Sequence, residues 1–339
     1  MTWAGTKSAA ASIMWRVGVS TRPITFSIEV SQRSYKGEIM YEDPFLFDTD
    51  IDLKNRLGAL TFDFDGYSKF ETGDRFELTK KLTKQYEIGV VFAARYVEVT
   101  SADIHSKFLG PTSYFIDTIG FTQTFDLRES PLVAPRGFVF NNTFDVATLG
   151  IGSEIDLMRI TARAGYYFSF GPKALTPGVV EDKRGPALKR WFQQSGLAFG
   201  ARAGIVHSLD NTGPDEPTTL PIDERFFNGG GTTVRSFGER TLGPLDRHGH
   251  PLGGEFYTIF NVEYTFPIYG ELQGALFADA GNLLPTSEEP GLDEMRYALG
   301  GGLRYNLPIG PIRLDYGWNP DRHRDEDFGA FHFSFGFAF

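Results

Sequence analysis

Residues 225–244 read RFFNGGGTTVRSFGERTLGP. The three glycines at 229 to 231 permit backbone conformations with positive φ that other residues avoid. Arg235 follows between apolar residues, and the next acidic residue is Glu239. A guanidinium presents five donors in a rigid fork, which suits buried carboxylates. The pattern therefore predicts a loop that folds back and docks into a polar cavity, and not one that only meets water.

This stretch resembles the signature loop of the outer-membrane barrel assembly superfamily, which includes BamA, TamA and the two-partner secretion transporters. The usual signature reads F-x-G-G, then V-R-G-F, and shortly afterwards L-G-P. The matching positions in this chain are Phe227, Gly229, Gly230, Val234, Arg235, Phe237, Leu242, Gly243 and Pro244. Ser236 departs from the usual glycine, which bears on the local backbone more than on the family. The alternative is a glycine-rich surface turn in a soluble β protein.

The composition excludes several classes of function. The chain has no cysteine, so it has no disulfide and no zinc–thiolate site. The net charge of -10 argues against nucleic acid as a partner. The sequence has no G-x-S-x-G, H-E-x-x-H or P-loop motif, so we expect neither an enzyme nor a cofactor. Asp246, His248 and His250 could hold a stray metal ion, but we interpret them as solvated loop residues and expect no metal site.

The residue pattern is typical of β-strands separated by turns. No apolar run reaches the length of about 18 residues that a transmembrane helix needs. Aromatic residues make up 15 % of the chain, with Phe 32 and Gly 39, as suits a barrel with aromatic girdles and tight turns. Residues 158–170 alternate, with Arg159 and Arg163 on the polar face, and Arg95 likewise lies opposite the apolar face of residues 86–100. The sequence predicts an all-β fold, a transmembrane antiparallel β-barrel of about sixteen strands.

The expected strands cover most of the chain. They include residues 22–32, 52–64, 70–82, 86–100, 112–127, 138–149, 158–170 and 196–205, and five more after the signature loop at 255–266, 271–280, 296–307, 312–318 and 331–339. An even count of sixteen requires a further strand in residues 2–10. We expect no long amphipathic helix. Residues 171–189 and 208–225 are expected to form long loops, both on the outer side of the barrel.

The last expected strand places phenylalanine at every second position. The chain ends on Phe339, and Phe337 and Phe339 resemble the C-terminal signal of bacterial outer-membrane proteins. Gly336 could let this strand kink, which would weaken the seam where the first and last strands meet. The alternative is the terminal core strand of a β-sandwich.

The resemblance also implies a site. In the family, the loop lies in the lumen, and its arginine contacts a glutamate and an aspartate in motifs that read NVEYTFP and LFADAG here. These acids are Glu263 and Asp279. Strand parity independently places both acids on the same side as Arg304, Arg313 and Asp315. An arginine removed from water needs such carboxylates, because an unpaired buried charge is costly. The alternative is that the acids only solvate a wet lumen.

The function implied by the resemblance is the folding and insertion of other proteins into the bacterial outer membrane through a lateral seam. The implied partners are unfolded outer-membrane proteins, membrane lipid and possible periplasmic or lipoprotein accessory subunits. Two alternatives stay open: a secretion transporter that passes an exoprotein through the lumen, and a passive porin. We expect residues 1–339 to form one barrel domain, without the family's N-terminal periplasmic domains. Lys7, Ser8 and Ser12 interrupt what would be a signal peptide, which suggests a mature or truncated piece, or a gene model with the wrong start.

Overall fold

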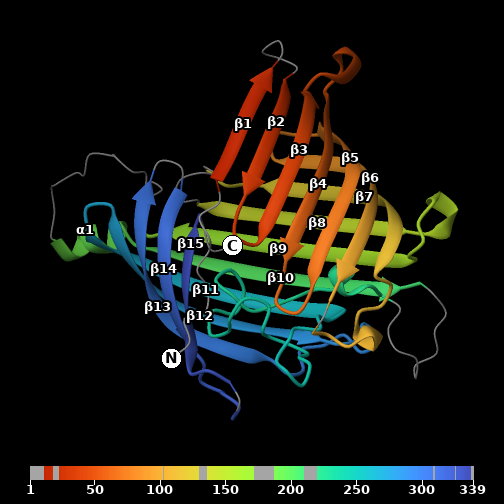
Figure 1. Cartoon of the computed structure of the whole chain (residues 1–339). Helices are drawn as coiled ribbons and strands as arrows, with labels where there is room; N and C mark the ends of the chain where they lie inside the picture. Colours follow the sequence, from red (N-terminus) through yellow and green to blue (C-terminus); the bar gives the residue numbers. More distant parts are fainter. Residues whose placement is uncertain are drawn as a thin grey trace.

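The computed structural model describes residues 11–17, 23–101, 103–129, 136–171, 187–209, 220–307, 310–324 and 326–336 of the 339-residue chain. The expected strand at residues 2–10, most of the expected loop 171–189, and Phe337 and Phe339 lie outside these residues. Fifteen strands form one antiparallel sheet whose spatial order follows the sequence from β1 to β15 (Figure 1). The expected all-β antiparallel fold is therefore confirmed, and the described strands number fifteen.

The strands are β1 (Ala11–Val17), β2 (Ile24–Val30), β3 (Ser34–Asp43), β4 (Ile51–Asp63), β5 (Ser68–Lys81), β6 (Tyr86–Thr100), β7 (Ser113–Asp126), β8 (Gly137–Ala147), β9 (Leu157–Ser169), β10 (Gly196–Ser208), β11 (Phe256–Tyr269), β12 (Leu272–Leu284), β13 (Arg296–Leu307), β14 (Gly310–Trp318) and β15 (Gly329–Phe335). The helical elements are α1 (Ala187–Gln193) and the 3-10 turns η1 (Leu46–Asp48), η2 (Ser106–Phe108), η3 (Leu149–Ile151) and η4 (Ile222–Glu224). None of the helices in the described part of the chain is long and apolar enough to cross a membrane.

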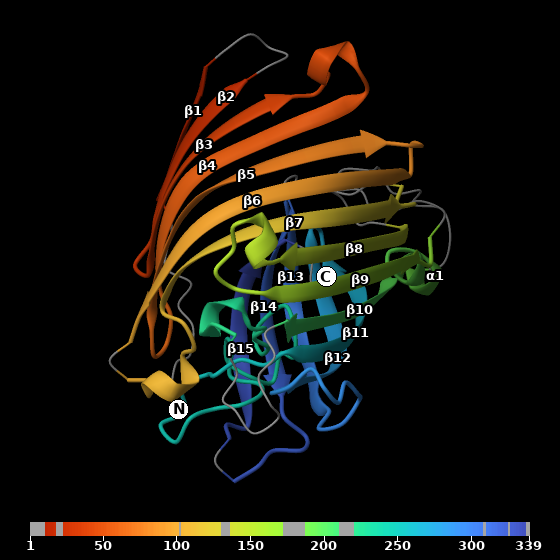
Figure 2. The same cartoon turned by 90° about the vertical axis from the view of Figure 1, so that its right-hand side faces the viewer.

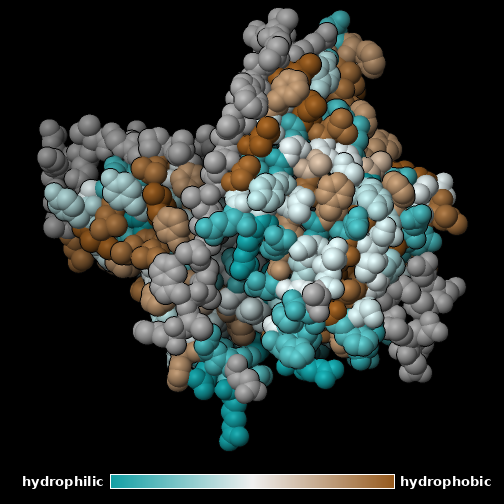
Figure 3. All heavy atoms as spheres, in the orientation of Figure 1, coloured by the Kyte–Doolittle hydropathy of each residue, from teal (hydrophilic) through white to brown (hydrophobic). Residues whose placement is uncertain are grey.

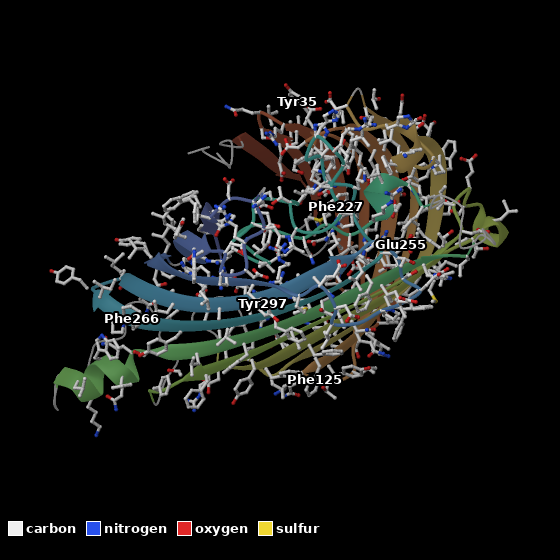
Figure 4. The ribbon with its side chains drawn as sticks, turned by 90° about the horizontal axis from the view of Figure 1, so that it is seen from below. Tyr35, Phe125, Phe227, Glu255, Phe266 and Tyr297 are labelled. Atoms are coloured by element: carbon white, nitrogen blue, oxygen red, sulfur yellow. The ribbon has the colours of Figure 1, made fainter. Side chains whose placement is uncertain are left out.

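The sheet curves strongly along its width. Figure 2 shows the strands fanning round, and Figure 4 shows the connection between β10 and β11 lying inside the curve, where Phe227 is labelled. Each strand pairs with its neighbours in sequence, but among the described residues no pairing joins β15 to β1. In Figure 1 the first strands rise away from the body of the sheet.

The two faces of the sheet have opposite chemistry, and β11 illustrates the difference. Phe260 and Val262 are 43% and 39% exposed on the outer face, whereas Asn261 and Glu263 are buried on the inner face. Exposed apolar side chains cover the outer surface of many strands (Figure 3). Large apolar residues outside and buried charges inside are the reverse of a water-soluble sandwich. They are the distribution expected of a sheet whose outer face meets an apolar medium.

The expected position of the two long loops is wrong. Residues 171–189 belong to the connection between β9 and β10, and residues 208–225 begin the connection between β10 and β11. Antiparallel neighbours run in opposite directions, so successive connections lie at opposite ends of the strands. The two connections flank the same strand, β10, and so leave the sheet at opposite ends. The first of them contains the short helix α1.

Candidate functional site

The candidate site is built on the connection between β10 and β11, whose residues 220–255 we call the inner segment. Its glycine run adopts the positive φ values that the sequence predicts, 102° at Gly229 and 111° at Gly230. A Cβ on Gly229 would lie 2.5 Å from the carbonyl oxygen of Gly238, so the turn has no room for a side chain. Single antiparallel bridges, Phe226 with Gly254 and Asn228 with Leu242, fold the segment back on itself.

Arg235 lies at the centre of the site and is 1% exposed. Its Nε and Nη2 atoms each donate to Asp279 of β12 over 2.8 Å, which makes a two-pronged ion pair. Its Nη1 atom donates to Glu263 of β11 over 2.6 Å. The backbone N–H of Arg235 also donates to Asp279, over 3.1 Å. The guanidinium carbon lies 3.4 Å from the centre of the Phe277 ring, so the ring closes off one face of the charge.

The carboxylates of this site are shared with further arginines from the last strands. Arg304 of β13 donates to Glu263 over 2.9 Å and to Asp315 of β14 over 2.5 Å. Arg313 of β14 donates to Asp315 over 2.9 Å. The result is a buried network of three arginines and three carboxylates, namely Arg235, Arg304, Arg313, Glu263, Asp279 and Asp315. Its formal charges balance, which is the condition under which buried charges are tolerated.

The network fixes the protonation of its arginine. Burial alone would lower the pKa of Arg235, but its hydrogen bonds to Asp279 and the nearby carboxylate of Glu263 raise the pKa further than burial lowers it. The charge is therefore retained inside the protein. The network fixes position as well as charge, because a planar guanidinium with two partners has one acceptable orientation.

The residues flanking Arg235 complete the docking. Val234, Phe237 and Leu242 are buried in an apolar cluster with Leu283 of β12 and Ala298 of β13. Ser236, which stands where the family usually has glycine, is buried, and its hydroxyl donates to the Tyr297 carbonyl over 2.8 Å. Its backbone is not among those with positive φ, so the serine fits without strain.

A second set of ion pairs holds the start of the inner segment. Glu224 accepts from Arg95 of β6 over 2.9 Å and from Arg159 of β9 over 2.7 Å. Asp223 accepts from the Tyr114 hydroxyl of β7 over 2.5 Å and pairs with Lys69 of β5 over 3.1 Å. Burial alone would raise the pKa of Glu224, but Arg95 and Arg159 lower it to about 2.

Arg240 provides a third attachment, to the turn between β4 and β5. It has a φ of 65°, which is uncommon for a residue other than glycine. Its Nη2 atom donates to the Tyr67 hydroxyl over 2.7 Å. The guanidinium carbon also lies 3.4 Å from the Phe227 ring centre and 3.9 Å from that of Phe64. The inner segment is thus joined to β5, β6, β7 and β9 through residues 223 and 224, and to the turn between β4 and β5 through residue 240. Residue 235 joins it to β11, β12, β14 and β15.

The sequence patterns singled out Arg235, Glu263 and Asp279, and the structure brings these three side chains together. They did not single out Asp223, Glu224 or Arg240 as site residues. A signal was present: two acids directly precede the signature stretch, and Arg95 and Arg159 stand on the polar faces of their strands. Strand alternation indicates that Arg95 and Arg159 face inward, but it does not indicate which side chains they contact.

The remaining predicted positions lie apart from this network. Gly336 follows the end of β15 with a φ of 94°, and its N–H donates to the Pro311 carbonyl over 2.8 Å. Asp246 accepts hydrogen bonds from the backbone N–H groups of His248 and His250. One ligand atom each from Asp246, His248 and His250 lies within 4.8 Å of the others. The internal hydrogen bonds account for this turn geometry.

Comparison with known proteins places this geometry in a family. The model of the Omp85 superfamily domain matches residues 22–339. The chain is 25% identical over 308 residues to the outer membrane protein assembly factor BamA of Nitratidesulfovibrio vulgaris, a match that covers 87% of this chain and 35% of that protein. It is 30% identical over 201 residues to the chloroplastic outer envelope protein 80 of Arabidopsis thaliana, covering 55% of this chain and 25% of that protein. The chain thus spans about a third of the first relative and a quarter of the second.

Two solved structures share the fold. The crystal structure of BamA from Haemophilus ducreyi lacking POTRA domains 1-3 aligns with a TM-score of 0.73 at 12% identity, covering 96% of this chain and 70% of that one. CdiB from Acinetobacter baumannii aligns with a TM-score of 0.56 at 12% identity, covering 96% of this chain and 56% of that one. At such identities the likeness concerns the fold alone.

Proposed function

Because the chain belongs to the Omp85 superfamily, we propose that it is the barrel domain of a factor that folds β-barrel proteins and inserts them into the bacterial outer membrane. In this proposal residues 1–339 form one domain of about sixteen strands, closed by its first and last strands. The inner segment occupies the lumen. Glu263 and Asp279 are the lumen partners of Arg235, and the clients are unfolded outer-membrane proteins.

The docked inner segment is the observation that carries the proposal. A passive porin does not need a buried arginine held by three strands through a balanced charge network, and it does not need a glycine turn that admits no side chain. The likeness to proteins named as assembly factors supports the same reading. The apolar outer face supports a position in the membrane, because the lipid-facing side chains of a membrane barrel are apolar. Every backbone group must be paired there, and in this proposal the sheet meets that need by closing.

The two ends of the sheet supply a route for clients. β1 and β15 each have one neighbour among the described residues, so each presents an edge. An edge strand carries unpaired N–H and C=O groups and is a template for a further strand. We propose that a client strand pairs with one of these edges, a form of β-augmentation. Gly336, beside the last strand, contributes to a weak seam that can open, and the terminal Phe337 and Phe339 belong to the C-terminal signal.

The test is to reconstitute the chain in lipid vesicles and time the folding of an unfolded outer-membrane protein. We expect folding faster than in empty vesicles, with Arg235→Ala slower than wild type. The secretion alternative makes a different prediction: ion conductance that increases when the inner segment is displaced, with no gain in client folding. Equal folding rates with and without the protein would overturn the assembly proposal. A lack of effect on client folding together with conductance in Arg235→Ala would favour the transporter.

A further inference from the structure

The short helix α1 lies on the outer face of the sheet, at the end opposite the inner segment. Figure 4 shows it beside the labelled Phe266. The Trp191 ring lies 5.8 Å from that of Phe266 and 6.4 Å from that of Tyr264, measured between centres. The indole N–H donates to the Pro267 carbonyl over 3.1 Å. By strand parity Tyr264 and Phe266 share the outward face of Phe260 and Val262, but they are half-buried because α1 covers them.

The helix is tied firmly to the strand that follows it. The N–H groups of Gln194 and Ser195 donate to the carbonyls of Trp191 and Phe192, and the Ser195 hydroxyl donates to the Trp191 carbonyl over 2.9 Å. The N–H of Phe170 donates to the Ser195 carbonyl over 3.2 Å. The rings of Phe170 and Phe192 lie 6.3 Å apart. The end of the helix is therefore part of the aromatic rim of β9, β10 and β11.

The helix has an apolar side that is exposed among the described residues. Leu188 and Phe192 are four residues apart, so they lie on the same side of the helix as Trp191. They are 69% and 47% exposed, although Trp191 beside them packs on the sheet. Lys189, three residues before Phe192, borders this side and is exposed. This apolar side continues the exposed apolar face of the sheet, where Phe168 and Phe170 are 40% and 41% exposed.

We propose that α1 is an interfacial anchor that lies in the headgroup layer of the membrane leaflet at this end of the barrel. Leu188 and Phe192 insert among the upper acyl carbons, Trp191 holds the helix against the wall, and Lys189 remains among the phosphates. A tryptophan at such a level is favoured because its ring is apolar and its N–H is polar. A short apolar face bordered by an exposed cation fits the pattern of a helix that lies in the interface. The occupant of the exposed face is therefore phospholipid.

This inference rests on the membrane position of the sheet that is proposed above. The chain has no cysteine, so single-cysteine variants can carry one fluorescent label each. The variants are Leu188→Cys, Phe192→Cys, the control Lys189→Cys at the exposed charged position and the mid-strand control Phe260→Cys. Each is reconstituted as the full chain in phospholipid vesicles whose acyl chains carry bromine quenchers at a shallow or a deep carbon.

We expect labels at 188 and 192 to lose more fluorescence to shallow than to deep bromine, and the label at 189 to lose less than either. The label at 260 should lose most to deep bromine. If 188 and 192 are quenched no more than 189, the anchor is refuted, and a protein partner on this face would give that result. Deeper quenching at 188 than at 260 would refute the interfacial depth. An unquenched label at 260 would instead refute the membrane position of the sheet itself.

Discussion

Arg235 joins the inner segment to the sheet through a buried charge. Arg235→Ala would leave Asp279 without its cation, whereas Glu263 would keep its ion pair with Arg304. Loss of one partner of a buried ion pair costs about 3–5 kcal/mol, and less where water screens the remaining charges. We expect the inner segment to loosen while the sheet remains folded, because the backbone ladders of β11 and β12 do not involve this side chain. Protease cleavage within residues 226–243 is the measurement.

The controls separate charge from geometry. Arg247→Ala removes the same group from an exposed position in the same segment, where the described residues offer it no ion pair, and it should leave cleavage unchanged. Arg235→Lys should restore protection only in part, because an ammonium cannot hold two carboxylates as a planar fork does. Wild-type resistance to cleavage in Arg235→Ala would show that the docked segment does not depend on this residue.

Glu224 makes the start of the inner segment sensitive to acid. Its pKa is lowered from 4.5 to about 2 by Arg95 and Arg159, against the effect of burial. A carboxylate with a lowered pKa stabilises the folded state above its unfolded pKa and loses that contribution as the pH falls through its folded pKa. We expect pepsin to cut at Phe226 and Phe227 increasingly as the pH falls from 4.5 towards 2. Glu224→Gln should be cut throughout that window.

Glu289→Gln is the matched control, because Glu289 is exposed in another loop. It should follow the wild-type pH dependence. Identical pH profiles for Glu224→Gln and wild type would mean that the ion pairs of Glu224 do not hold the segment.

The sequence predicted the contacts of Arg235 better than those of Asp223 and Arg240. The sequence predicts the contact of Arg235 with Glu263 and Asp279 because each of the three lies in a motif. Strand alternation also indicates the direction in which the two acids point. Asp223 and Arg240 lie in irregular backbone, where no period fixes direction. Their partners, Lys69 and Tyr67, are more than a hundred residues away in sequence. Contacts of that kind follow from the curvature of the sheet, which local patterns do not contain.

Among the secondary-structure elements, most strands were predicted from the alternation of apolar and polar residues. The strands from β4 onward follow the expected ranges to within a few residues, because one face of each strand had to be apolar. The expectation that both long loops lie on one side was wrong, because connectivity decides at which end of the strands a loop lies and composition does not. Helix α1 is only seven residues long, too short for its apolar side to stand out from the aromatic strands around it.

The outer face of β11 allows a test of its surroundings. Val262 lies near the middle of the strand and Tyr269 at its end, and both point away from the charge network. Arginine on the lipid face of a barrel costs about 2–4 kcal/mol at the bilayer midplane and about 0–1 kcal/mol near the interface. We expect Val262→Arg to lower the free energy of unfolding in vesicles by more than Tyr269→Arg does. Denaturant titration measures this free energy. Equal and small effects would place this face in water.

At the scale of the whole molecule, the inner segment acts as a brace across the curve of the sheet. Its attachments reach strands from β5 to β9 on one side and from β11 to β15 on the other, where His332 of β15 is hydrogen-bonded to the Arg235 carbonyl over 3.0 Å. At the ends of the sheet, β1 and β15 each pair with only one neighbour among the described residues. We therefore expect the seam between the first and last strands to yield before the braced region does. Hydrogen exchange should be faster in β1 and β15 than in β6 and β11, and the reverse order would contradict the brace.

In the proposed function, client proteins enter the membrane through that seam, and a disulfide bond across the seam is the direct test. A cysteine at position 335 of β15 would be paired with cysteines scanned along residues 2–17, in a chain that has none of its own. We expect the cross-linked protein to remain folded, with heat-modifiable mobility in electrophoresis, and to fold clients no faster than empty vesicles do. Reduction of the disulfide should restore the activity. Client folding at the wild-type rate with the cross-link fully formed would contradict the account.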